Sequence, residues 1–260
     1  MNELNNYQTP NSAGSFPART FPTLYFYLRV TWVVFRAAAN ARKKQYTREK
    51  WIDDSCEIIS ILEKSGCRFK ITGRENLAGN SSPRVFIANH MSTLETFVLP
   101  CLLRSEPGLT YVVKKELIDY PVFRHVMRSR DPVVVGRENP REDFKTVMRE
   151  GLSRLEQGIS IILFPQTTRS NNFDPRFFNS MGIKLAKKAG VPAVPVAVKT
   201  DAWSAGKILK DFGSIKKDRP IRFAFAPPMR VTGNGKREHE KCLEFISGHI
   251  AEWNKQTEQK

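Results

Sequence analysis

The stretch Arg84-Val-Phe-Ile-Ala-Asn-His90-Met-Ser-Thr-Leu-Glu95 joins a short apolar run to a polar segment. Its apolar part, Val85–Ala88, predicts a short buried strand. The strand pattern ends at Asn89 and His90, and an amphipathic segment then runs from Ser92 to about Leu103. A buried strand that leads directly into a helix is the repeating unit of α/β folds.

The same unit recurs along the rest of the chain. Apolar runs predict strands at Phe69–Ile71, Val85–Ala88, Leu109–Val113, Pro132–Val135, Ile159–Phe164, Ala193–Val198 and Ile221–Phe225. Helical spacing of apolar residues predicts helices at Trp51–Leu62, Glu142–Gln157, Met181–Ala189 and Arg237–Lys255. We therefore predict an α/β fold with a mixed, largely parallel sheet flanked by helices and preceded by an N-terminal helical membrane-seating segment. The expected organisation is a disordered leader (1–20), a helical membrane-associating segment (21–66) and an α/β domain (67–260).

Composition narrows the class of protein. Hydrophobic residues make up 40% of the 260 residues, which indicates a globular chain. The net charge of +16 favours anionic partners such as phosphorylated substrates, an anionic membrane or nucleic acid, but no zinc-finger or RNA-binding signature accompanies it. The chain has four cysteines: Cys56, Cys67, Cys101 and Cys242. They have no C-x-x-C spacing and are too sparse for a disulfide scaffold, so we expect a reducing, cytosol-facing location and no metal site.

The segment from Phe21 to about Ala39 is rich in aromatic and β-branched residues and long enough for several helical turns. Arg29 and Arg36 would share one face of that helix. Because a charge at the bilayer centre costs at least ~2.5 kcal/mol, we expect the helix to lie in the membrane interface rather than span it. The basic run Arg42-Lys-Lys44 favours an anionic cytoplasmic leaflet. A cleaved signal peptide and a plain core helix are the alternatives.

His90 and Glu95 are the candidate catalytic pair. A histidine at the carboxyl end of a strand lies where open α/β sheets bind ligands, and a carboxylate five residues later could hold the imidazole. The alternative is structural, because Ser92-x-x-Glu95 before an apolar run is also a capping box.

A second polar loop follows the apolar run Ile161–Leu163, in the sequence Phe164-Pro-Gln-Thr-Thr-Arg-Ser170. Together with Asn89-His90 and a carboxylate five residues on, this loop resembles the glycerolipid acyltransferase family, which includes enzymes that acylate 1-acylglycerol-3-phosphate. Three further blocks agree in order: Lys114-Lys-Glu-Leu117, Val133-Val-Val-Gly-Arg137 and Val191-Pro-Ala-Val-Pro-Val196. The resemblance covers about residues 69 to 200.

The resemblance implies transfer of a fatty acyl group from acyl carrier protein or acyl-CoA to the free hydroxyl of a lysophospholipid, giving phosphatidic acid. His90 would be the general base, and Glu95 would orient its ring. Lys114, Arg137 and Arg169 match positions that bind the acceptor's phosphate, and Thr168 and Ser170 would shape their loop. No cofactor, metal or nucleic acid is expected, and the enzyme would sit peripherally on the cytoplasmic face of the membrane.

This chain departs from the family pattern at three places. The family has aspartate where Glu95 stands, and Glu-Gly where Gln166-Thr167 stands. Asn179-Ser-Met181 replaces two lysines and a glycine. These changes leave another lysolipid acceptor and a non-catalytic lipid-binding scaffold as alternatives. A general polyanion-binding module is a third alternative, which rests on the net charge of +16 alone.

Overall fold

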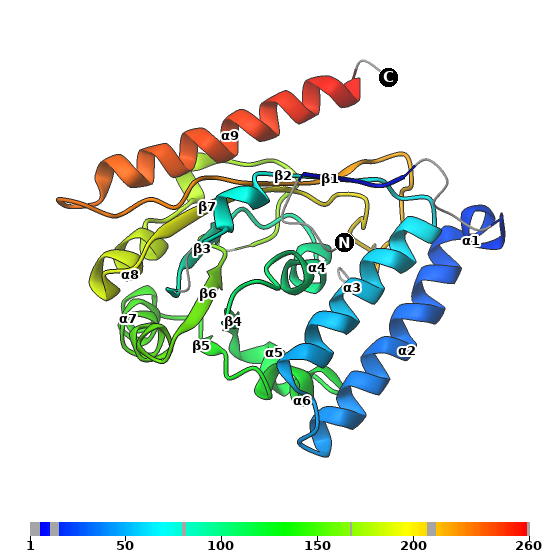
Figure 1. Ribbon diagram of the computed structural model, residues 1–260, viewed down its shortest axis with the longest axis horizontal. Helices are drawn as coiled ribbons and strands as arrows, with labels where there is room; N and C mark the ends of the chain where they lie inside the picture. The colour runs from blue at the N-terminus through cyan, green and yellow to red at the C-terminus, as the bar shows by residue number, and fades with distance from the viewer. Residues whose placement is uncertain (1–5, 11–15, 80–81, 167, 207–211, 259–260) are drawn as a thin grey trace.

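The computed structural model describes residues 6–10, 16–79, 82–166, 168–206 and 212–258. Within these residues one eight-stranded sheet has the order β1-β2-β8-β7-β3-β6-β4-β5 (Figure 1). Its strands are β1 (Tyr7–Gln8), β2 (Phe69–Thr72), β3 (Val85–Ala88), β4 (Gly108–Lys114), β5 (Val133–Val135), β6 (Ile159–Leu163), β7 (Ala193–Lys199) and β8 (Ile221–Phe225). The pairs β1–β2 and β7–β8 are antiparallel and the other neighbours are parallel, which confirms the predicted fold class.

Helices cover both faces of this sheet. They are α1 (Phe16–Thr20), α2 (Pro22–Arg42), α3 (Arg48–Lys64), α4 (Leu94–Leu102), α5 (Lys115–Asp119), α6 (Phe123–Arg128), α7 (Pro140–Glu156), α8 (Met181–Ala189) and α9 (Lys236–Glu258). Two short 3₁₀ turns, η1 (Arg74–Leu77) and η2 (Pro175–Phe177), complete the described elements.

Alternating strand residues divide the core into two layers. Phe86 and Ala88 pack with apolar residues of α2, α3 and α4. Val85 and Ile87 point the other way and pack with residues of α7, α8 and α9. Figure 1 shows α2 and α3 on the side of the molecule away from α7 and α8. The two faces of the protein are therefore built by different helices.

The N-terminal segment differs from its prediction in one respect. The leader expected to be disordered contains β1, which pairs with β2, and the helix α1. The Tyr7 and Thr9 hydroxyls each donate a 2.7 Å hydrogen bond to Glu63 Oε1, so contacts with α3 hold this strand in place. A two-residue strand has no period that a sequence pattern could reveal.

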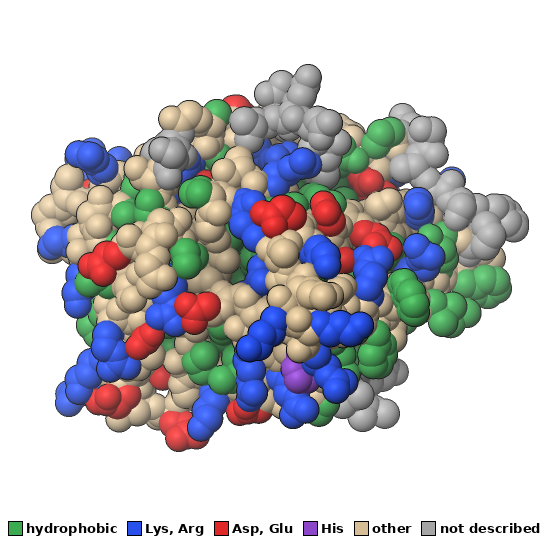
Figure 2. All heavy atoms as spheres, turned by 60° about the horizontal axis from the view of Figure 1, so that its bottom comes forward, with side chains coloured by type: hydrophobic (Ala, Val, Ile, Leu, Met, Phe, Trp, Pro, Cys, Tyr) green, Lys and Arg blue, Asp and Glu red, His purple; other side chains and the backbone are tan. Residues whose placement is uncertain are grey.

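The helix α2 is apolar on two faces, one packed in the core and one exposed. Its inner face buries Phe26, Val30 and Val33 in the same core as the sheet. The outer face of α2, with Phe21 directly before it, leaves large apolar side chains more than half exposed: Phe21, Leu24, Leu28, Trp32 and Phe35. Figure 2 shows hydrophobic side chains gathered at the right-hand end of the molecule, the side on which α2 lies in Figure 1. Among the described helices, none combines the length and the apolar character that a membrane crossing requires.

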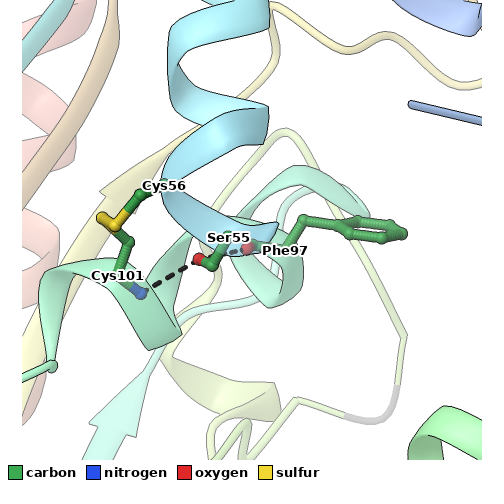
Figure 3. Close-up of a disulfide and its surroundings, with 4 residues drawn as sticks. All are labelled: Ser55, Cys56, Phe97 and Cys101. Atoms are coloured by element: carbon green, nitrogen blue, oxygen red, sulfur yellow. Dashed lines mark hydrogen bonds between the residues drawn. A yellow bond between two sulfur atoms is a disulfide. The ribbon is translucent and has the colours of Figure 1, made fainter. Parts of the chain in front are cut away.

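Pro100 interrupts the backbone hydrogen bonds of α4. A proline has no N–H to donate, so the Thr96 carbonyl loses its helical partner. The buried Tyr111 hydroxyl donates to that carbonyl instead, at 3.1 Å. In the next position the Ser55 hydroxyl of α3 accepts from Cys101 N at 3.0 Å and donates to the Phe97 carbonyl at 2.6 Å (Figure 3). Neighbouring elements thus complete the helix that begins beside Glu95.

A disulfide between Cys56 of α3 and Cys101 of α4 joins the same two helices (Figure 3). This bond was not expected from the cysteine spacing, which gave no sign of pairing, and it removes the argument for a reducing location that rested on that spacing. The two residues are separated by 45 positions, and connectivity at that distance cannot be deduced from sequence alone. Cys67 and Cys242 are free and buried.

The disulfide predicts a defined thiol count. In denaturant without reductant, a maleimide should label only Cys67 and Cys242, because the other two sulfurs are bonded to each other. Reduction should expose all four cysteines of the chain and lower the free energy of unfolding by about 2–4 kcal/mol. Mass spectrometry gives the count. Four labels before reduction would contradict the bond, whereas a Cys56→Ser variant should label at Cys101 as well.

Candidate active site

The predicted site residues follow neighbouring parallel strands. His90 follows β3, Lys114 ends β4, Arg137 follows β5 and Arg169 follows β6. Because parallel strands end at the same edge of a sheet, these side chains are brought to one carboxyl edge. Thr200, which directly follows β7, lies at that edge too.

His90 and Glu95 are in direct contact. His90 Nδ1 lies 2.8 Å from Glu95 Oε1. One face of the imidazole stacks on Phe164, with ring centroids 4.3 Å apart, and the His90 side chain is 15% exposed. Since Nδ1 is engaged by the carboxylate, Nε2 is the nitrogen that can accept a proton from a bound molecule.

The Glu95 carboxylate is fully buried and receives hydrogen bonds on both oxygens. Oε1 also accepts from the backbone N–H groups of Met91 at 2.6 Å and Ser92 at 2.9 Å. Oε2 accepts from the hydroxyls of Ser92 at 3.1 Å and Thr200 at 2.5 Å. Burial alone raises the pKa of Glu95, but the hydrogen bonds and the His90 ring outweigh it and leave this pKa below its usual value.

The same contacts include part of the predicted capping box. The helix α4 begins at Leu94, and the Ser92 hydroxyl accepts from Leu94 N at 3.1 Å. Glu95 bonds the Ser92 N–H in return, so it does hold the start of the helix. Both interpretations describe one carboxylate, whose Oε1 also faces the imidazole.

Hydrogen bonds connect the loop that carries His90 to β7 on one side and to the loop after β6 on the other. The Asn89 side chain pairs with the backbone of β7, donating to the Val198 carbonyl at 2.9 Å and accepting from Val198 N at 2.8 Å. The His90 N–H donates to Gln166 Oε1 at 2.6 Å, and Ser170 N donates to the His90 carbonyl at 3.0 Å. The buried Gln166 therefore connects the two polar loops. Thr167, where the family has glycine, lies outside the described residues.

The three predicted phosphate-binding residues, Lys114, Arg137 and Arg169, lie near one another, and we call this group the basic corner. Lys114 forms an ion pair with Glu116 at 2.5 Å. The pKa of Arg137 lies below its usual value, mainly because the side chain is partly buried and further because of the positive charge of Arg169. The carboxylates of Asp143 and Glu116 act in the opposite direction. Arg169 also donates to the Thr93 hydroxyl in front of α4. This corner would attract a phosphate group.

The loop after β6 is organised by Ser170, whose hydroxyl donates to the Asn172 carbonyl at 2.7 Å and accepts from Asn172 N at 3.2 Å. Thr168 is exposed beside it. A cavity of about 140 Å³ lies next to the loop, smaller than the roughly 300 Å³ typical of small-molecule pockets. Its lining comes from the loops after β3, β6 and β7: Met91, Ser92, Thr93, Arg169, Ser170, Asn171, Trp203, Ser204, Ala205.

Two residues of the site were not predicted from the sequence. Thr200 bonds Glu95, and Trp203 lines the cavity while its indole N–H donates to the Tyr27 hydroxyl of α2 at 3.0 Å. The position of Thr200 directly after the predicted strand Ala193–Val198 could have indicated it, since carboxyl ends of strands carry site residues. No comparable signal marks Trp203.

Comparison with known proteins identifies the class of this protein. The model of the Acyltransferase family matches residues 68–199, which is half of the chain. The chain belongs to this acyltransferase family and is an acyltransferase enzyme. Among its relatives is a 1-acyl-sn-glycerol-3-phosphate acyltransferase of Pseudomonas aeruginosa, 30% identical over 192 residues that cover 72% of this chain and 71% of the relative.

Other relatives agree over shorter stretches. A 1-acyl-sn-glycerol-3-phosphate acyltransferase of Saccharomyces cerevisiae is 30% identical over 152 residues, covering 57% of this chain and 48% of its own. A chloroplastic one from Arabidopsis thaliana is matched over 38% of its length. The crystal structure of the 1-acyl-sn-glycerophosphate acyltransferase PlsC from Thermotoga maritima has a TM-score of 0.65, with 21% identity, 89% coverage of this chain and 94% of that chain. This last likeness concerns the fold.

The Thr200–Glu95 bond predicts a shift in acid stability. The pKa of Glu95 is depressed, so its contribution to stability is present above the usual carboxyl pKa and is lost as the pH falls through the lower folded value. Thr200→Val removes a donor to the carboxylate and should move that loss to higher pH. It should also lower the free energy of unfolding at neutral pH by about 1–3 kcal/mol.

Circular dichroism across an acid titration measures this shift. Thr72→Val is the matched control, because the Thr72 hydroxyl makes only a 3.5 Å contact with the Phe223 carbonyl. Equal acid curves for the two variants would contradict the assigned role of Thr200.

Proposed function

We propose that this enzyme transfers a fatty acyl group from an acyl thioester to the free hydroxyl of 1-acyl-sn-glycerol-3-phosphate, forming phosphatidic acid in phospholipid biosynthesis. The observation that carries the proposal is the His90–Glu95 pair at 2.8 Å, placed at the same sheet edge as three basic side chains. The names of the relatives support this acceptor. Acyl carrier protein and coenzyme A are the two candidate donors.

In the proposed reaction His90 is the general base. Its Nε2 takes the proton of the acceptor hydroxyl as the hydroxyl oxygen attacks the thioester carbonyl. A C–O bond forms, the C–S bond breaks, and the departing thiolate takes the proton back from the imidazolium. The buried Glu95 carboxylate keeps Nδ1 protonated and stabilises the imidazolium while it exists. The acyl group passes directly to the acceptor.

The basic corner would hold the phosphate of the acceptor. Arg137 and Arg169 offer planar groups of donors that suit phosphate oxygens, and Lys114 adds a positive charge. Lys114 is paired with Glu116 at 2.5 Å, and an incoming phosphate would compete with that carboxylate for the lysine. Thr93 positions Arg169 through its hydroxyl. Binding the phosphate here would bring the neighbouring hydroxyl of the glycerol within reach of His90.

The first test is an acylation assay. Purified protein is incubated with acyl thioesters and a panel of lysolipids, and the product is followed by mass spectrometry. His90→Ala should lower the rate by at least about 10²-fold, because proton removal from the hydroxyl contributes typically 10²–10⁴-fold. Glu95→Gln should lose most activity, since an amide cannot stabilise an imidazolium.

Arg169→Gln should instead raise the KM for the phosphorylated acceptor more than for a lysolipid without a terminal phosphate. Equal acylation by His90→Ala and the unchanged protein would refute the proposed base. Preference for an unphosphorylated acceptor would refute the proposed phosphate site.

We also propose that α2 seats the enzyme peripherally on the cytoplasmic face of a membrane. Leu28 and Trp32 are 66% and 63% exposed. A soluble protein rarely exposes large apolar side chains side by side in this way. Arg36 is turned away from this stripe and pairs with Asp54 and, at 2.6 Å, with Glu57 of α3. Burial of each large apolar side chain in lipid would contribute about 1.5–3 kcal/mol. Arg42, Lys43 and Lys44 at the helix end would face anionic headgroups.

Point variants test this seat better than truncation, because α2 also buries Phe26, Val30 and Val33 in the core. Leu28→Glu/Trp32→Glu should release the protein from anionic vesicles in a sedimentation assay and leave its unfolding midpoint nearly unchanged. Ala251→Glu/Thr257→Glu adds the same charge at exposed positions of α9 and should stay bound. Retention of the α2 variant at the same salt would refute the proposed seat.

A further inference from the structure

A second concave surface lies between α7 and α8. It is an open groove of about 650 Å³. Phe144 and Met148 of α7 form an apolar floor, and five cationic side chains surround them. The groove is lined by Phe144, Lys145, Met148, Arg149, Lys184, Lys187, Lys188 and Asn234, none of which is acidic. The proposed acyl transfer at the His90 edge uses none of these residues.

The cations on the two sides of this groove differ in their pairing. On α7, Lys145 bonds Glu142 at 2.8 Å and Arg149 bonds Glu150 at 3.1 Å. On α8, the exposed lysines form no ion pair within the part of the chain that the structure describes: Lys184, Lys187, Lys188. Lys184 Nζ lies 5.4 Å from the centre of the Phe144 ring, which places a charge directly over the apolar floor. The groove therefore carries uncompensated positive charge beside apolar surface.

Three neighbouring lysines repel one another, and their spacing at i, i+3 and i+4 places them on one side of α8. An acidic ligand would relieve this repulsion. An apolar floor with a cationic rim complements a surface that presents apolar residues beside acidic ones. Such a pattern suits an amphipathic acidic helix of a partner protein, and an open groove fits the side of a helix better than it encloses a small molecule.

The groove lies near the edge of the sheet at which the proposed reaction takes place. The helix α7 begins three residues after Arg137, at the edge of the sheet that carries His90, and Phe144 lies about 6 Å along it at 1.5 Å per residue. The apolar stripe of α2 belongs to the other layer of the core (Figure 1). When α2 rests on a membrane, the groove is left for a partner that arrives from water.

We propose that this groove docks an acidic acyl carrier protein, which is the donor of the acyl group. The inference rests on the proposed function, and it deepens that function by choosing between the two donors. The carrier's acidic helix lies against the α8 lysines with its apolar residues over Phe144 and Met148. Its flexible thioester arm then reaches over the carboxyl edge to His90. Coenzyme A has no acidic helix and no apolar residues to cover Phe144 and Met148, so its use as donor should depend little on the groove.

The test compares both donors with one variant. Lys184→Glu/Lys188→Glu reverses two charges of the groove, and Lys70→Glu/Lys255→Glu is the matched control at exposed lysines on β2 and the end of α9. With acyl carrier protein, kcat/KM should fall by at least about tenfold in the groove variant, because attraction between complementary charges speeds association. With acyl-CoA it should change less than about twofold. The control should match the unchanged protein with both donors.

Binding of the carrier protein without its acyl group, measured by fluorescence anisotropy at two salt concentrations, gives a readout independent of turnover. It should weaken with salt and be lost in the groove variant. Equal loss with both donors, no loss with the carrier protein, or turnover with acyl-CoA alone would each overturn the docking site. Loss of vesicle binding by the groove variant would reassign the lysines to a membrane contact. If the unchanged protein acylates no lysolipid with either donor, the proposed function fails, whereas the binding measurement still decides the groove.

Discussion

The site depends on one buried charge. Glu95 has no exposed surface, and a carboxylate removed from water is costly unless its oxygens are fully hydrogen-bonded. Its donors come from two segments: the loop after β3, which supplies the His90 imidazole and the Met91 and Ser92 amides, and the Thr200 hydroxyl after β7. The carboxylate can stay ionised only while these segments keep their positions. Because the buried carboxylate needs these hydrogen bonds, including the one from His90, it also holds the imidazole in one orientation.

The longer side chain of glutamate fits this arrangement. The family has aspartate at this position, and Glu95 reaches the imidazole while one of its oxygens also receives Met91 and Ser92 amides. The helix that carries Glu95 is stiffened where Pro100 would weaken it. Tyr111 and Ser55 replace the broken backbone bonds, and the Cys56–Cys101 disulfide ties α4 to α3 two turns from Glu95. These supports come from outside the helix, since its own sequence leaves carbonyl groups unpaired.

Local pattern was sufficient for the parts of the fold that repeat. The seven predicted strands and the long helices α3, α7, α8 and α9 are present with small shifts at their ends, because burial imposes a period on their residues. His90 could be singled out because it follows such a strand closely, Glu95 because it lies five residues further on, and Arg169 through the resemblance to the acyltransferase family. The Thr200 contact, the Ser55 bridge and the disulfide could not, because they join segments 42 to 105 residues apart and leave no period. Sequence pattern thus pointed to the residues that we propose as the reacting groups and missed the contacts that position them.

The two proposed substrates come from different surroundings, and the two faces of the molecule differ in a corresponding way. A lysophospholipid resides in a membrane, whereas a carrier protein is dissolved in water, so one edge of the enzyme must be accessible from both. The exposed stripe of α2 and the cationic groove of α7 and α8 lie over opposite layers of the core, and both layers meet at the carboxyl edge of β3. His90 lies at that boundary, and Trp203 connects α2 to the cavity beside it. A parallel sheet suits this division, because it gathers loops from both faces at a single edge.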